Sequence, residues 1–99
     1  MPHRLAPEAS VELDAIWYYI ATESGDVETA DRLIDSLTGS FLLLAQYPHM
    51  GRRRDADLRP GLRSFPAGAY LIIYRVDNMG VLILHVVRGS RDIAALFGQ

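Results

Sequence analysis

Arginine is the residue type that most clearly suggests chemistry in this sequence, and it is densest in GRRRDADLRPGLRSF, residues 51–65. This stretch holds five arginines and two aspartates, so its charge is 5 − 2 = +3 in a chain of net charge −2. A guanidinium group presents a planar fork of donors that fits a phosphate or a carboxylate. We therefore predict an anion-docking surface. The candidate residues for binding a target or a partner are Arg52, Arg53, Arg54, Arg59, Arg63, Arg75, Arg88 and Arg91.

The charge is divided unevenly along the chain. Residues 1–50 hold two arginines and eight acidic residues, a balance of −6, whereas residues 51–99 hold eight arginines and four aspartates, a balance of +4. This polarity predicts one acidic and one basic face. A simpler interpretation of the arginine-rich stretch stays open. In that interpretation the stretch is a solvated connector loop. Asp55 and Asp57 pair with neighbouring arginines, and such exposed pairs add little stability.

Metal-independent cleavage of RNA is one reaction in which clustered arginines can take part. It needs a base for the 2′-hydroxyl, a donor for the leaving oxygen and cations for the phosphate. The second half of the chain contains no glutamate, so it offers few groups for proton transfer. If the protein is a nuclease, the candidate residues are Arg63, Arg88, Arg91, His85 and Tyr74.

Packing is the simpler interpretation of the titratable members of that set. His85 has the strand parity of Val81 and Ile83, so we expect its side chain to point where theirs do. Tyr74 has the parity of Ile72, which favours a packing role for its ring. Because no complete acid–base set is visible, we assign no catalytic residue. The pattern favours a binding protein over an enzyme.

Other kinds of site lack their residues. The chain has no cysteine, which excludes disulfides, thiolate zinc sites and thiol nucleophiles. Its three histidines lack the spacing of metal ligands and no glycine-rich loop follows a strand, so we expect neither a metal nor a cofactor. The apolar runs are far shorter than the roughly 20 residues of a membrane span. The first ten residues also lack a signal-peptide core, so we expect a cytoplasmic protein without membrane contact.

The first half of the chain predicts a short strand and two helices. Residues 3–6 form the strand, and a helix follows with Pro7 in its first turn. Its apolar face includes Trp17, for which we expect a core position, and Gly25 ends it. Asp26 is the predicted N-cap of a second helix with an apolar stripe of about four turns. So short a connection predicts an antiparallel helical hairpin.

The second half changes to strand periodicity. Residues 62–65 predict a short strand, 66–68 a turn, and 70–76 with 81–87 a β-hairpin. The nearly continuous apolar residues of the last two strands indicate a sheet that is buried on both faces. The helical hairpin covers one face, and the tail 92–97 or a partner covers the other. The predicted order is β-α-α-β-β-β, an α+β fold with the helical hairpin packed on one face of a small, mostly antiparallel sheet.

Three short motifs occur in order along the chain: Pro48-x-Met50-Gly51-Arg52, Arg63-x-Phe65-Pro66-x-Gly68-x-Tyr70 and Gly89-x-Arg91-Asp92. With this order and spacing the sequence resembles the ParE toxins of the RelE/ParE superfamily, the toxic halves of bacterial type II toxin–antitoxin pairs. The resemblance implies one toxin domain over 1–99 and a ParD-like antitoxin whose acidic, helical C-terminal segment wraps the toxin. Arg88 stands where the family often has histidine, so a role for an imidazole there is not carried over.

Three functions are consistent with this resemblance. In the first, the chain poisons DNA gyrase and a ParD-like antitoxin neutralises it. In the second, it cleaves mRNA on the ribosome, as RelE-like toxins do. In the third, it binds an antitoxin-like protein but is not toxic. All three predict an apolar groove with a basic rim on the sheet face away from the helical hairpin, where an acidic amphipathic segment binds.

Overall fold

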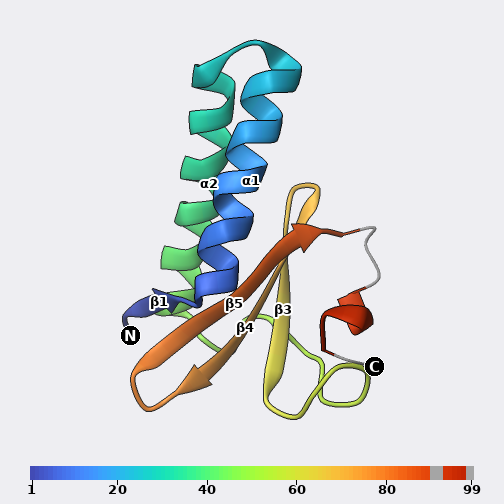
Figure 1. Ribbon diagram of the computed structural model, residues 1–99. Helices are drawn as coiled ribbons and strands as arrows, with labels where there is room; N and C mark the ends of the chain where they lie inside the picture. Colours follow the sequence, from blue (N-terminus) through green and yellow to red (C-terminus); the bar gives the residue numbers. More distant parts are fainter. Residues whose placement is uncertain (90–92, 98–99) are drawn as a thin grey trace.

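The computed structural model, which describes residues 1–89 and 93–97, is a helical hairpin packed on a five-stranded sheet (Figure 1). The predicted α+β class and element order are confirmed, with one further strand and a short 3-10 helix added. The elements are β1 (His3–Leu5), α1 (Pro7–Ser24), α2 (Val27–Gln46), β2 (Arg52–Arg53), β3 (Leu62–Ala67), β4 (Tyr70–Asp77), β5 (Gly80–Arg88) and η1 (Ile93–Phe97).

Both ends of the helical connection follow the local sequence signals. Pro7 is the first residue of α1, where its missing N–H costs no hydrogen bond. Gly25 ends α1 in the left-handed conformation, with φ +67°, which a side chain would strain. The Asp26 side chain accepts from the N–H of Glu28 at 3.0 Å and caps α2. The predicted end of α1 and the predicted N-cap of α2 are therefore confirmed.

The strand order in the sheet is β1-β5-β4-β3-β2. β1 runs parallel to β5 with His3 opposite Val81, and the other pairs are antiparallel, so the sheet is mostly antiparallel as predicted. The expectation of a simple connector loop was wrong for two of its arginines. Arg52 and Arg53 form the short strand β2, which pairs with β3. Their backbone passes beside the edge of the sheet, and the pairing provides it with hydrogen-bond partners.

The predicted turn at 66–68 was also wrong, because Pro66 and Ala67 belong to β3. Pro66 lies opposite Leu71 of β4, and the turn begins at Gly68, with φ +62°. β2 pairs only with the start of β3, so the outer edge of β3 has no neighbouring strand at Pro66. A proline without an N–H is tolerated at such an edge.

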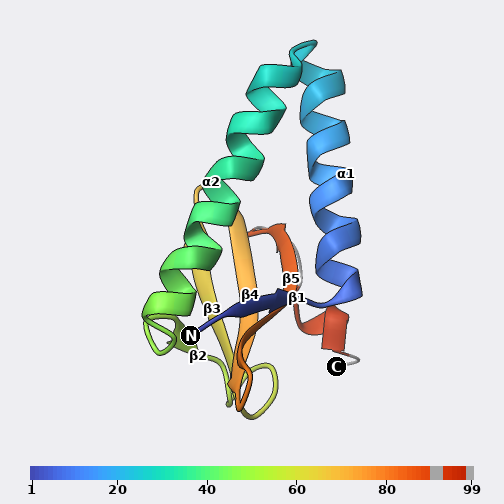
Figure 2. The same ribbon diagram turned by 90° about the vertical axis from the view of Figure 1, so that its left-hand side faces the viewer.

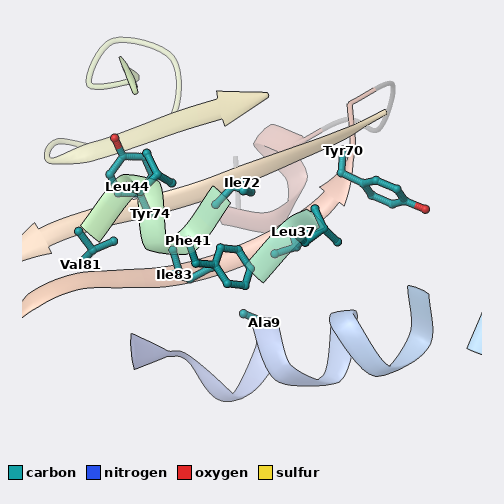
Figure 3. Close-up of a cluster of buried hydrophobic side chains, with 10 residues drawn as sticks. Ala9, Leu37, Phe41, Leu44, Tyr70, Ile72, Tyr74, Val81 and Ile83 are labelled. Carbon is teal, nitrogen blue, oxygen red and sulfur yellow. The ribbon is translucent and has the colours of Figure 1, made fainter. Parts of the chain in front are cut away.

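The main core lies between the helices and the sheet. Figure 3 shows Leu37, Phe41 and Leu44 of α2 beside Ile72 and Ile83 of the central strands, and all of these side chains are fully buried or nearly so. Ala9 of α1 is also fully buried, and its small side chain lets the helix approach the sheet closely. Apolar burial of this extent is the main stabilising term of such a domain.

The opposite face of the sheet has its own small core. Leu58, Leu62, Ile73 and Phe97 are buried together there. Phe97 comes from η1, which lies across the sheet from α2 and below the first turns of α1 (Figure 2). The prediction that the tail covers the second face is therefore confirmed for the described part, residues 93–97.

The core position expected for Trp17 was wrong. Gly25 ends α1 at the connection to α2. From this connection the two helices diverge toward the sheet, and the hairpin extends beyond the sheet (Figures 1 and 2). Trp17 is therefore only half-buried, and its Nε1–H donates to the carboxylate of Asp31 on α2 at 2.8 Å. It fastens the two helices together rather than filling the core.

Candidate functional site

The connector from α2 into the sheet is fixed by the hydroxyl of Tyr74. This side chain of β4 is fully buried, as its strand parity predicted. Its Oη accepts from the N–H of Gly51 at 2.8 Å and donates to the carbonyl of Pro48 at 2.9 Å. Burial raises the pKa of the hydroxyl above its usual value. The Tyr74 hydroxyl is thus buried, and both of its hydrogen bonds are made to the backbone of the connector.

Gly51 is required by this contact. A Cβ at position 51 would lie 2.4 Å from Tyr74 Oη and 2.9 Å from the carbonyl oxygen of Ser64. On β3, Arg63 donates through Nη1 to the carbonyls of His49, at 3.2 Å, and Gly51, at 2.9 Å. The first two sequence motifs are therefore neighbours in space, and their residues hold one junction between helix and sheet.

Two of the candidate arginines pair with aspartates of their own loop. Arg53 Nε donates to Asp55 at 2.8 Å, and Arg54 Nε donates to Asp57 at 2.9 Å. The pKa of Asp55 is lowered, first by the N–H of Gly61 and then by Arg53. The pKa of Asp57 is lowered chiefly by the hydrogen bond from Arg54. The local-pairing interpretation therefore describes these two guanidinium groups.

The other candidate arginines are spread over the molecule. Arg59 donates to the carbonyl of Phe97 at 2.7 Å and lies 5.3 Å from the centre of its ring, which holds η1 on the sheet. Arg88 lies 5.9 Å from the ring centre of Tyr70. Arg52 and Arg75 are exposed, and Arg91 lies outside the described residues. Their contacts with a target or an antitoxin stay a prediction.

His85 does not point with Val81 and Ile83, so that prediction was wrong. A register shift in the β4–β5 pairing leaves Leu84 without a partner on β4, which reverses the parity beyond it. The His85 ring packs edge-on against Phe97, with 5.5 Å between ring centroids. Tyr74 belongs to the core on the helix side, so the structure does not bring these two nuclease candidates together.

Glu12 of α1 is a residue that sequence reasoning missed. One of its carboxylate oxygens lies 3.0 Å from His85 Nδ1, and the other accepts from the N–H of Val86 at 3.0 Å. β1 pairs with β5 only as far as Ile83, so the edge of β5 beyond it has no neighbouring strand. There the Glu12 carboxylate accepts the hydrogen bond that a neighbouring strand would otherwise accept. No local signal marks this role, because the contact spans 73 residues of sequence.

Two hollows have arginine in their walls, and the first of them is mainly apolar. One, of about 450 Å³, lies between α1 and the end of the β4–β5 hairpin. Its lining residues are Ala15, Ile16, Tyr19, Tyr70 and Arg88. The other, of about 320 Å³, lies on the sheet face that carries η1 and has both Arg59 and Arg75 in its wall. This second hollow is on the face where the groove was predicted, although η1 occupies part of that face.

Two helices on a five-stranded mixed sheet, with hollows bordered by arginine, define a small α+β domain. Among residues 1–89 and 93–97 no cluster of ligating side chains fits a metal ion. In the same part of the chain, no helix is both long and apolar enough to span a membrane.

The family follows from comparison with known proteins. A model described as the ParE toxin of the type II toxin–antitoxin system parDE matches residues 4–93, so the chain belongs to this toxin family. Toxin ParE3 of Caulobacter vibrioides is 32% identical over 90 residues, covering 91% of this chain and 88% of the relative. Toxin ParE1 of Mycobacterium tuberculosis is 30% identical over 90 residues, covering 90% of each.

A solved structure has the same fold. It is described as the chromosomal ParDE TA system from P. aeruginosa, and it superposes with a TM-score of 0.76. The match covers 89% of this chain and 95% of the other, at 23% sequence identity. At this identity the likeness is evidence for the fold.

Proposed function

We propose that this ParE-family toxin inhibits growth by poisoning DNA gyrase and that a cognate ParD-like antitoxin neutralises it. The observation that carries the proposal is the match to the ParE toxin family over residues 4–93. A toxin of a type II pair needs a protein that holds it inactive. The apolar hollow bordered by Arg88 suits the apolar side of an amphipathic segment, and the more polar hollow with Arg59 and Arg75 in its wall suits acidic side chains.

The contacts of Tyr74 and His85 favour gyrase over ribosome-bound mRNA as the target. An RNA-cleaving site needs a base and an acid within reach of one phosphate. The Tyr74 hydroxyl instead donates a hydrogen bond to the carbonyl of Pro48, and His85 contacts Glu12 and Phe97 near the tail. These internal contacts support inhibition by binding rather than by cleavage.

The deciding experiment is a supercoiling assay with purified gyrase and the purified toxin. We expect loss of supercoiling as toxin is added, and recovery when the antitoxin is mixed with the toxin first. In cells, induction of the toxin alone should stop growth and induce the DNA-damage response, whereas co-expression of the antitoxin should restore growth. Normal supercoiling at saturating toxin would contradict the gyrase target.

The ribosome-dependent alternative has its own readout. Toxin added to a translating extract would cleave mRNA within codons occupied by ribosomes, and intact mRNA under those conditions removes this alternative. The non-toxic alternative predicts binding of the antitoxin with normal growth, and growth arrest on induction of the toxin alone removes it. Together, the three assays separate the hypotheses.

A further inference from the structure

Two arginine side chains face each other across the short β2–β3 ladder. Arg53 lies directly opposite Arg63 in the antiparallel register. Like charges directly opposite each other on neighbouring strands are destabilising unless something lies between them to offset their repulsion. Both arginines border a pocket of about 220 Å³, together with His49, Asp55 and Val76. Asp55 offsets the charge of Arg53, whereas no carboxylate among the described residues pairs with Arg63.

Arg63 is held in place with one edge of its guanidinium unused. Both of its hydrogen bonds, to the carbonyls of His49 and Gly51, use Nη1. Within residues 1–89 and 93–97, it forms no ion pair, and its Nε and Nη2 make no hydrogen bond. The Nε–Nη2 edge is one that a carboxylate accepts with two parallel bonds.

The opposite side of the pocket is nearly neutral. Arg53 is 74% exposed, and its Nε donates to Asp55. The other oxygen of Asp55 accepts from the N–H of Gly61, which fixes the carboxylate at the rim. By formal charge at pH 7, two guanidinium groups and one carboxylate give the lining 2 − 1 = +1, which one monovalent anion balances.

We propose that this pocket is an oxyanion site that binds one carboxylate on the Nε–Nη2 edge of Arg63, with Arg53 closing over it. A carboxylate has two acceptor oxygens, and this edge satisfies both. A phosphodiester presents two anionic oxygens to such an edge as well, so dimethyl phosphate is the competing probe. The occupant is an Asp or Glu side chain of an acidic partner segment, and this last identification rests on the proposed function.

The site can be tested on the isolated chain with sodium acetate as the probe. The Nε–H signal of Arg63 is followed by NMR while acetate replaces chloride at constant ionic strength. We expect a saturable shift of this signal. Arg63 stays unsubstituted because it also holds the connector. Arg53→Gln removes the second cation and should weaken acetate binding about threefold, the effect of one unit charge at about 6 Å in water.

A second variant changes the affinity in the opposite direction. Asp55→Asn keeps an acceptor for Gly61 but removes the competing charge, so acetate should bind about threefold more tightly. Arg32→Gln, on α2, changes the net charge as Arg53→Gln does and should leave the affinity unchanged. Far-UV circular dichroism checks that each variant is folded.

Three results would overturn the proposal. The first is a shift of the Arg63 signal that does not saturate with acetate. The second is an Asp55→Asn variant that binds acetate no better than the native chain. The third is tighter binding of dimethyl phosphate than of acetate, which would assign the pocket to a phosphodiester. None of these measurements involves gyrase or growth, so this proposal and the proposed function can fail separately.

Discussion

Removing one hydroxyl from the core tests how the connector is attached to the sheet. Tyr74→Phe keeps the ring in its buried position and deletes only the Oη atom. The N–H of Gly51 then loses its acceptor, and the carbonyl of Pro48 loses its donor. Arg63 remains bonded to the same connector, so we expect a less stable protein with the native fold rather than an unfolded one.

The size of the effect follows from burial. The bond from Gly51 to the hydroxyl is buried, and an orphaned buried donor costs about 1–3 kcal/mol. The bond to Pro48 is partly buried, so water can replace part of it. We therefore expect a loss of about 2 kcal/mol in the free energy of unfolding. For a domain of this size that corresponds to a melting temperature lower by about 8–16 °C.

Urea unfolding followed by circular dichroism measures the loss directly. The midpoint should fall with an unchanged slope, because the same surface is exposed on unfolding. Tyr18→Phe is the matched control, since Tyr18 is 70% exposed and makes no hydrogen bond among the described residues. We expect the control to stay within about 0.5 kcal/mol of the native chain.

A double-mutant cycle with Gly51→Ala sharpens the test. Alanine at this position should be strongly destabilising, because its Cβ would lie 2.4 Å from Tyr74 Oη. Tyr74→Phe removes the contact with Oη but leaves the ring carbon Cε1 at 2.7 Å and the Ser64 carbonyl oxygen at 2.9 Å from the new Cβ. The clash is therefore relieved in part, and the double variant should lose less stability than the sum of the two single variants. The reasoning is refuted if Tyr74→Phe is as stable as Tyr18→Phe, or if the two losses simply add.

Four further outcomes are expected. Asp26→Ala removes the N-cap of α2 and should lower stability by about 1 kcal/mol in urea unfolding, whereas Asp26→Asn should recover most of it. Glu12→Ala leaves the N–H of Val86 without its acceptor and should increase concentration-dependent association in light scattering, an effect that Glu12→Gln avoids. The Arg4 hydrogen bond holds the pKa of Asp77 below the ordinary 3.8, so its stabilisation is present above that pH and is lost as the pH falls through the folded-state pKa. Asp77→Asn should therefore melt lower than the native chain near neutral pH, and the difference should vanish in acid. Finally, raising salt by about 150 mM should slow association with an acidic antitoxin more than it speeds dissociation, and salt-independent association in stopped-flow mixing would contradict a steering role for the arginines.

The parts of the fold that were predicted from sequence depend on local interactions. Gly25 and Asp26 mark the helical connection because a left-handed glycine and a side-chain cap act within a few residues. Pro66 was misplaced because whether a strand can hold a proline depends on the neighbouring strand, which sequence position does not reveal. Trp17 was misplaced because an apolar stripe gives the face of a helix but not how far the sheet extends beneath it.

The candidate site was predictable in composition but not in arrangement. Arginine density indicated anion binding, yet Arg59 contacts Phe97 and Arg63 contacts the connector backbone, and neither contact is local in sequence. The orientation of His85 depends on the irregular pairing at Leu84. The sequence does not mark this irregularity, because Leu84 is one apolar residue among several in the strand. Glu12 was missed for the same reason, since its contacts lie on the last strand.

The fold keeps the two charges of the chain apart instead of neutralising them. Residues 7–46 carry one arginine and eight acidic residues, 1 − 8 = −7, whereas residues 52–88 carry seven arginines and three aspartates, 7 − 3 = +4. In the described part of the chain, no arginine of the sheet pairs with a carboxylate of the helical hairpin. An acidic segment is therefore repelled by the helices and attracted to the sheet. The same separation leaves the free edge of Arg63 open to a carboxylate from outside, because the hairpin supplies none.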